Sequence, residues 1–230
     1  GCSDLTTFHF APGTTQIANG LFAGCPGVQA IVIPNGVTEI KSGAFRGCTA
    51  LTSVTLPTGV TTIGQDCFRD CTALPTLDLP DTVTSIPREC FSGCTALTSV
   101  GLSDNLTSID VKAFYQSGLT AVFIPEGVTT VNDAAFKNCT ALASVSLPGS
   151  LTTVGTETFM NTAMTNVALA SATANIGAYV FGYETYYTKT EPFTVYGVAG
   201  SCAETYANNN AFPFVALTVG NTNLDGTVNI

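Results

Sequence analysis

Phenylalanine returns at an almost constant interval along the chain, and this repetition constrains the fold more than any other feature. The frame C-x-x-L-x-x-V-x-L-P-x-x-V-T-x-I-x-x-x-A-F recurs around it, and four copies begin with the letters C-T-A-L. A fixed period of this length indicates an architecture in which each repeat is one structural unit stacked on the next. The repeat phenylalanines, separated by 23 or 22 residues, are Phe22, Phe45, Phe68, Phe91, Phe114, Phe136, Phe159 and Phe181.

One repeat is enough to predict how each turn of the stack is built. In Leu51–Leu56 apolar and hydroxyl side chains alternate, which is typical of a strand with one buried face. Pro57 has no N–H for a strand ladder and ends the strand. We expect Cys67 and Phe68 in a short helical segment that closes the turn. Stacked turns then place parallel strands about 4.8 Å apart and bury each ring, a gain of roughly 1.5–3 kcal/mol per phenylalanine.

The period and pattern fall in the leucine-rich-repeat range. The sequences AIVIPNGVTEIKSGAFRGC (Ala30–Cys48) and AVFIPEGVTTVNDAAFKNC (Ala121–Cys139) resemble the BspA-like leucine-rich repeats of bacterial and protozoan surface proteins. Val195–Leu217 is similar to the C-terminal cap of that family. The resemblance extends from Cys2 to about Leu217. It implies a right-handed solenoid on a secreted or cell-surface protein that serves in adhesion or protein binding.

We therefore predict an α/β fold, a right-handed leucine-rich-repeat solenoid of parallel short strands and short helical turns. It has about eight rungs of 22–23 residues, where a rung is one turn of the stack, plus a C-terminal cap. The solenoid spans residues 1–217, with the cap from about residue 193, and Ser201 and Glu204 form a capping box that starts a short helix. Cys2 occupies the closing position of a rung, so we expect the chain to begin within a repeat of a longer protein.

Residues 218–230 differ in kind from the repeats and are predicted to be a linker with the start of a calcium loop. GNTNLDGTVNI (Gly220–Ile230) resembles the first calcium loop of a dockerin, which implies ligand positions at Asn221, Asn223 and Asp225. The segment stops before the acidic twelfth position of such a loop. We therefore expect no bound cofactor here, and Ca²⁺ only in a longer chain. The resemblance implies docking to a cohesin, and the alternative is a generic linker rich in Asn, Asp and Gly.

Charge and composition exclude several classes of function. The formal net charge is −9, and the 7 basic residues are scattered singly, which disfavours nucleic acid and anionic membranes. No apolar run approaches the roughly 20 residues that span a bilayer. The chain has a single histidine, His9, and no phosphate-binding or zinc-protease motif. We therefore expect no enzymatic activity and no catalytic residues.

The nine cysteines follow the repeat instead of a metal-ligand spacing. Most of them lie three residues after a repeat phenylalanine, where Ser117 and Thr162 stand in other rungs, which predicts small buried side chains and free thiols. Cys67 and Cys90 replace alanine in adjacent rungs, at a separation that suits a disulfide. The alternative for this pair is two small core residues. Abundant free thiols in a secreted protein suggest an anaerobic habitat.

Two surfaces are candidates for binding. The outward strand positions form a small, neutral and nearly flat row that suits a protein or glycan partner, and a merely solvated sheet is the alternative. An insertion at Gly182–Pro192 interrupts the period and offers tyrosine rings, which otherwise would pack beneath the cap. The predicted binding residues are His9, Val32, Thr55, Asp78, Phe123, Ser146, Tyr183, Tyr186 and Tyr187.

These observations predict a non-enzymatic recognition module of the adhesion type, secreted from or displayed on a bacterium. We expect a monomer that binds protein or glycan partners. The alternative function is the targeting or substrate-binding part of a dockerin-bearing, fibre-degrading complex similar to a cellulosome.

Overall fold

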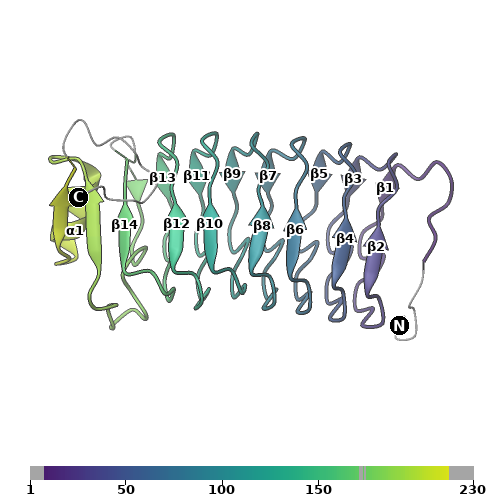
Figure 1. Cartoon of the computed structure of the whole chain (residues 1–230), viewed down its shortest axis with the longest axis horizontal. Helices are drawn as coiled ribbons and strands as arrows, with labels where there is room; N and C mark the ends of the chain where they lie inside the picture. The colour runs from purple at the N-terminus through teal and green to yellow at the C-terminus, as the bar shows by residue number, and fades with distance from the viewer. Residues whose placement is uncertain (1–7, 171–172, 174, 218–230) are drawn as a thin grey trace.

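The computed structural model describes residues 8–170, 173 and 175–217. The chain forms an elongated stack of like turns, with the first strands at one end and a helix-containing cap at the other (Figure 1). Two series of short parallel strands run along the stack. The fold is thus the predicted solenoid of repeats closed by a cap.

The first series consists of three-residue strands whose middle residue faces the interior and whose first residue is exposed. These strands are β2 (Ala30–Val32), β4 (Ser53–Thr55), β6 (Thr76–Asp78), β8 (Ser99–Gly101), β10 (Ala121–Phe123), β12 (Ser144–Ser146) and β14 (Asn166–Ala168). Equivalent residues pair in parallel between rungs, as in Val32 with Thr55 and Phe123 with Ser146. The outward positions of this series therefore lie in rows along the stack.

The second series consists of two-residue strands, each ending in a residue that faces the core. These are β1 (Gln16–Ile17), β3 (Glu39–Ile40), β5 (Thr62–Ile63), β7 (Ser85–Ile86), β9 (Ser108–Ile109), β11 (Thr130–Val131), β13 (Thr153–Val154) and β15 (Asn175–Ile176). Their side chains are an outward polar residue followed by Ile or Val, which matches the V-T-x-I part of the repeat.

The third side of each rung, which we call the turn side, is not helical as predicted. Residues 65–70 around Phe68 form a run of hydrogen-bonded turns. The reason is the backbone of Asp66 and Asp70, which have φ of 55° and 58°, two residues before and two residues after the phenylalanine. Left-handed residues cannot continue a right-handed helix. The same two positions are left-handed around Phe45, where both are glycine, Gly43 and Gly47.

The repeat phenylalanines form one continuous spine, as predicted. Neighbouring rings are stacked, with centroids 5.1–5.5 Å apart and interplanar angles of 3–12°. All eight rings are buried. Such offset stacks add about 0.5–1.5 kcal/mol per pair beyond the burial of apolar area. The spine therefore ties each rung to the next.

At one junction two prolines interrupt both strand ladders, whereas the gaps between β8 and β10 and between β12 and β14 lie in the first series alone. Within the described residues, β4 is not hydrogen-bonded to β6, nor β5 to β7. In the next rung, the N–H of Thr98 donates to the carbonyl of Pro75 in the rung before it. At the junction of β4 and β6 the residue equivalent to Thr98 is Pro75 itself, which has no N–H to donate. Pro87 has the same effect in the second series. The equivalent residue of the next rung, Asp110, donates its N–H to the carbonyl of Ile86, and Pro87 has no N–H for such a bond. The junction is held instead on the turn side, for example by the N–H of Phe68 and the carbonyl of Cys90 at 2.9 Å.

Seven cysteines of the described residues are free thiols, and four of these link rungs. Cys48 donates to the carbonyl of Phe22, the phenylalanine of the rung before it, at 3.1 Å, and Cys71, Cys94 and Cys139 repeat this contact. Cys67 and Cys90 are free and buried, so the small-core interpretation of this pair holds. Cys25 departs from the expectation of free thiols, because it is disulfide-bonded.

The cap consists of β16 (Thr194–Gly197), α1 (Cys202–Asn209) and β17 (Phe214–Ala216). Ser201 caps α1 by accepting from the N–H of Ala203, and the carboxylate of Glu204 accepts from the N–H of Gly200 at 2.7 Å. The strand β16 extends the first series beyond β14, and β17 follows it. The hydroxyl of Tyr206 bonds both the N–H and the carbonyl of Phe181, each at 2.9 Å. These contacts seal the exposed end of the last rung.

Candidate binding surfaces

The outward side of β2 to β14, which we call the strand face, carries two large exposed apolar side chains. Val32 is 72% exposed and Phe123 is 65% exposed. Thr55 and Asp78 lie between them and are exposed as well, while Ser146 beyond Phe123 is half-buried. His9 is exposed but lies outside the strands, before β1, so the row begins at Val32.

The centre of the strand face is shaped by Gly101. This glycine pairs with Asp78 in the preceding strand, and a Cβ atom on it would lie only 2.4 Å from an oxygen of that carboxylate. The carboxylate of Asp78 therefore lies over the glycine of the next rung. Since strands in a sheet are about 4.8 Å apart, Phe123 stands roughly 10 Å from Asp78 along the row. A carboxylate and an exposed aromatic ring thus flank one small residue.

Positive charge is absent from the strand face. The seven basic residues all lie on the turn side or in the insertion before the cap, at Lys41, Arg46, Arg69, Arg88, Lys112, Lys137 and Lys189. On the turn side they are balanced by carboxylates, as in the ion pairs of Arg69 with Glu89 and of Lys137 with Glu157. Partial burial works against the charged form of Glu157 and is the largest single influence on it. Hydrogen bonds from Lys137 and Tyr186, together with the positive charge of Lys137, outweigh it in sum and lower the pKa of Glu157.

Carboxylates also line the turn that follows the strand face. Asp81, Asp104 and Glu126 occupy equivalent positions in three consecutive rungs, all exposed, and we call this row the acidic edge. Within the described chain, none of them and neither oxygen of Asp78 forms an ion pair. The sequence prediction missed this row. The signal was an acidic residue directly after the repeat proline, or after the serine that replaces it, in three consecutive repeats. The strand face and its edge together are acidic and partly apolar.

The structure separates the three predicted tyrosines of the insertion. Tyr183 is buried beneath the cap and donates a hydrogen bond to the side-chain oxygen of Asn210 at 2.7 Å. Tyr186 is 47% exposed and lies 5.2 Å from the ammonium of Lys137, measured to the ring centroid. Tyr187 is 97% exposed. The three rings therefore do not form one platform.

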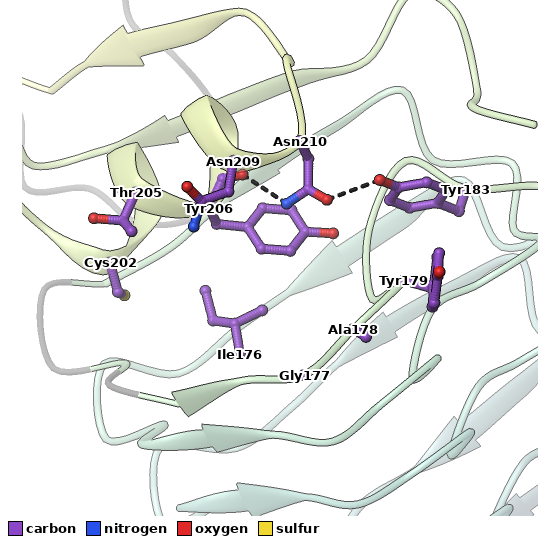
Figure 2. A pocket seen from close by; sticks show the side chains of 10 residues that line it. All are labelled: Ile176, Gly177, Ala178, Tyr179, Tyr183, Cys202, Thr205, Tyr206, Asn209 and Asn210. Carbon is purple, nitrogen blue, oxygen red and sulfur yellow. Dashed lines mark hydrogen bonds between the residues drawn. The ribbon is translucent and has the colours of Figure 1, made fainter. Parts of the chain in front are cut away.

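A cavity of about 550 Å³ lies between the last repeat and α1, and we call it the cap cavity. Figure 2 shows its side chains converging from α1 and the residue after it on one side, and from the end of β15 and the residues that follow it on the other. Sequence reasoning did not find it, because its two walls are separated by the whole insertion. The lining residues are Ile176, Gly177, Ala178, Tyr179, Tyr183, Cys202, Thr205, Tyr206, Asn209 and Asn210.

Clusters of metal ligands and membrane-spanning helices are both absent from the described residues. No three His, Cys, Asp or Glu side chains of the described chain gather closely enough to hold a metal ion. Asn221, Asn223 and Asp225, the predicted calcium ligands, lie outside the described residues. None of the helices described has the length and apolar character to cross a bilayer.

The geometry defines the class of protein: a parallel β-solenoid of short repeats that presents open surfaces. The BspA type leucine rich repeat region, in six copies, matches residues 1–91 and 61–188. This is more than half of the chain, so the chain belongs to the BspA-type leucine-rich-repeat family, as its motifs predicted. Such repeat modules bind partners and are not enzymes as a rule.

Solved structures share the fold. A leucine-rich-repeat protein of T. pallidum is 29% identical with a TM-score of 0.60, over 64% of this chain and 69% of that one. A leucine-rich cell surface protein of Faecalibacterium prausnitzii is 24% identical with a TM-score of 0.51, over 76% of this chain and 64% of that one. This chain therefore spans less than two thirds of the second protein. No curated protein matches the chain.

Proposed function

We propose that the chain is an adhesion-type recognition module that binds a protein partner through the strand face. The observation that carries this proposal is Phe123, an aromatic ring 65% exposed in the middle of a rigid sheet that has no positive charge. Exposed aromatic side chains surrounded by polar groups are typical of the central contacts of protein interfaces.

Charge complementarity defines the partner. Four carboxylates, those of Asp78 and the acidic edge, lack a basic neighbour within the described residues. A partner that brings lysine or arginine next to an apolar side chain would pair with these carboxylates and cover Phe123 and Val32. Electrostatic attraction of this kind raises the association rate and weakens as salt screens it. We therefore propose a partner surface that is basic and partly apolar.

The test is binding of the purified chain to immobilised extracellular-matrix proteins and glycans, measured at low and high salt. Binding to basic proteins, weaker at high salt, is expected. Phe123→Ala should weaken it at least about tenfold, as loss of a central aromatic contact does. Neutralising the acidic edge by Asp81→Asn, Asp104→Asn and Glu126→Gln should lower the association rate and its salt dependence.

Tyr187→Ala is the matched control, because this ring is exposed but lies in the insertion before the cap, outside β2 to β14. It should leave binding unchanged. A partner that is bound equally well by Phe123→Ala, or lost with Tyr187→Ala, would move the site away from the strand face. A preference for acidic proteins would contradict the charge argument.

The proposal includes the location of the protein. The family resemblance supports secretion from a bacterium or display on its surface, and the buried free thiols support an anaerobic habitat. The alternative, a targeting part of a fibre-degrading complex that docks to a cohesin, depends on residues 218–230. These lie outside the described residues, and no observation of the structure favours that role.

A further inference from the structure

The cap cavity has the chemistry of a site for a neutral, hydroxyl-rich ligand. None of its ten lining residues, all within the described chain, carries a charged side chain, so an ionic ligand would find no counter-charge. Its volume of about 550 Å³ falls in the range of roughly 300–1,000 Å³ that holds small ligands. Its walls alternate tyrosine rings and aliphatic groups with amides and a hydroxyl.

We propose that the cap cavity binds a saccharide unit without formal charge. A purely apolar ligand would bury the amide and hydroxyl groups without partners, which is unfavourable. A sugar offers hydroxyl groups to those partners and C–H faces to the rings. This site is separate from the strand face and does not depend on it.

Tyr179 is the ring best placed to form the floor of such a site. It has φ of 56°, at the left-handed position that Gly20, Gly43 and Asp66 occupy in earlier rungs. A bulky residue is disfavoured in this conformation, so the backbone gives no reason for a tyrosine here. The side chain supplies the reason instead, because it lines the cavity and packs against neighbouring tyrosine rings.

Neighbouring rings hold Tyr179 in place. Tyr183 and Tyr186 contact it edge to face, with centroids 5.2 and 5.3 Å away and interplanar angles of 81° and 83°. Tyr186 is itself fixed beside Lys137. A ring supported from two sides loses little conformational freedom when a ligand stacks on it, which favours binding.

The opposite wall supplies hydrogen-bonding groups in fixed positions. Asn210 accepts from the hydroxyl of Tyr183 and donates to the carbonyl of Tyr206, each at 2.7 Å, and this leaves the Tyr183 oxygen able to accept (Figure 2). Thr205 and Asn209 are exposed on the face of α1 that lines the cavity. The amide of Asn209 carries both donors and an acceptor, which suits a pair of adjacent sugar hydroxyls.

The experiment titrates the protein with a defined panel, the methyl glycosides of glucose, galactose, mannose and N-acetylglucosamine and their β-1,4-linked disaccharides. Saturation-transfer NMR detects binding. The chain has no tryptophan, so its intrinsic fluorescence comes from tyrosine and should change when a sugar covers Tyr179. We expect at least one neutral sugar to bind with a dissociation constant below ~10 mM.

Two variants locate the site. Tyr179→Gly removes the ring and suits the left-handed backbone, so the fold is kept, and it should weaken binding at least about tenfold. Asn209→Ala removes an exposed amide and should weaken binding several-fold. Tyr187→Ala is the matched control and should bind as the unaltered chain does, as should Phe123→Ala on the strand face.

Three results would overturn the proposal: no sugar of the panel binds at ~10 mM, binding survives both Tyr179→Gly and Asn209→Ala, or a charged sugar such as glucuronic acid binds better than its neutral counterpart. Because Phe123→Ala affects only the strand face, a failure here leaves the proposal on protein binding intact, and the reverse also holds.

Discussion

Truncation of a ring in the middle of the phenylalanine spine tests the architecture most directly. Phe91 is fully buried and stacks on Phe68 and Phe114, with centroids 5.5 and 5.2 Å away. Replacing a buried phenylalanine by alanine costs about 3–5 kcal/mol, which includes the cavity left behind. The two stacks lie within that figure at about 0.5–1.5 kcal/mol each. We therefore expect Phe91→Ala to lower the free energy of unfolding by about 4 kcal/mol.

The position of Phe91 adds a second expectation. Its rung contains Pro75 and Pro87, which interrupt both strand ladders toward the preceding rung, and the 5.5 Å spacing to Phe68 is the widest in the spine. Stability in a stacked array depends on contacts between neighbouring rungs. Phe91→Ala should therefore uncouple the N-terminal rungs from the rest, so that unfolding occurs in two steps.

Urea denaturation followed by far-UV circular dichroism and tyrosine fluorescence measures both effects. Phe136→Ala is the matched control, because this ring is equally buried and its rung contains β11, which is hydrogen-bonded to strands on both sides. It should lose a similar free energy but unfold in one step. A loss below about 1 kcal/mol in both variants would refute the stacked spine as the main link between rungs. One-step unfolding of Phe91→Ala would refute the weak junction.

Three further predictions concern individual groups. Burial raises the pKa of Cys48 to about 11, so at pH 8 only roughly a thousandth of this thiol is in the reactive thiolate form. A disulfide reagent should therefore modify the half-buried Cys202 first, and Cys48 only after the protein unfolds. Glu157→Gln should lower the free energy of unfolding by about 1–2 kcal/mol at pH 7. Because the folded pKa of Glu157 is lowered, this difference should persist above pH 4.5, the ordinary value for glutamate, and disappear as the pH falls below it, as pH-dependent denaturation would show. Tyr206→Phe leaves a buried N–H and a buried carbonyl of the last repeat phenylalanine without a partner. This substitution should lower the free energy of unfolding by about 2 kcal/mol and speed amide hydrogen exchange in the cap. Equal exchange rates in the variant and the unaltered protein would contradict the role of Tyr206 in holding the cap on the last rung.

The repeat frame determines most of the fold because like residues return at like positions. Stacking of identical turns follows from the period, and the alternation in Ser53–Thr55 fixes which side chains face outward. The sequence therefore predicts the spine, the rows of the strand face and the exposure of Val32 and Phe123. It also predicts the cap helix, since the Ser201 and Glu204 pattern is local in the chain.

Only the tertiary structure decided the features that depend on residues far apart or on backbone dihedral angles. The sequence of the turn side predicts a short helix, but the left-handed backbone of Asp66 and Asp70 prevents one. Whether Cys67 and Cys90 were linked could not be read from spacing that suits both states, and they are free. The cap cavity forms because α1 packs near the last repeat, although the insertion separates the two in sequence. Tyr179 and Asn209 thus line one cavity, and no repeat pattern in the sequence predicts this. The period predicts the positions that recur in every rung, and within the described residues the cap and the insertion before it lie where that period ends.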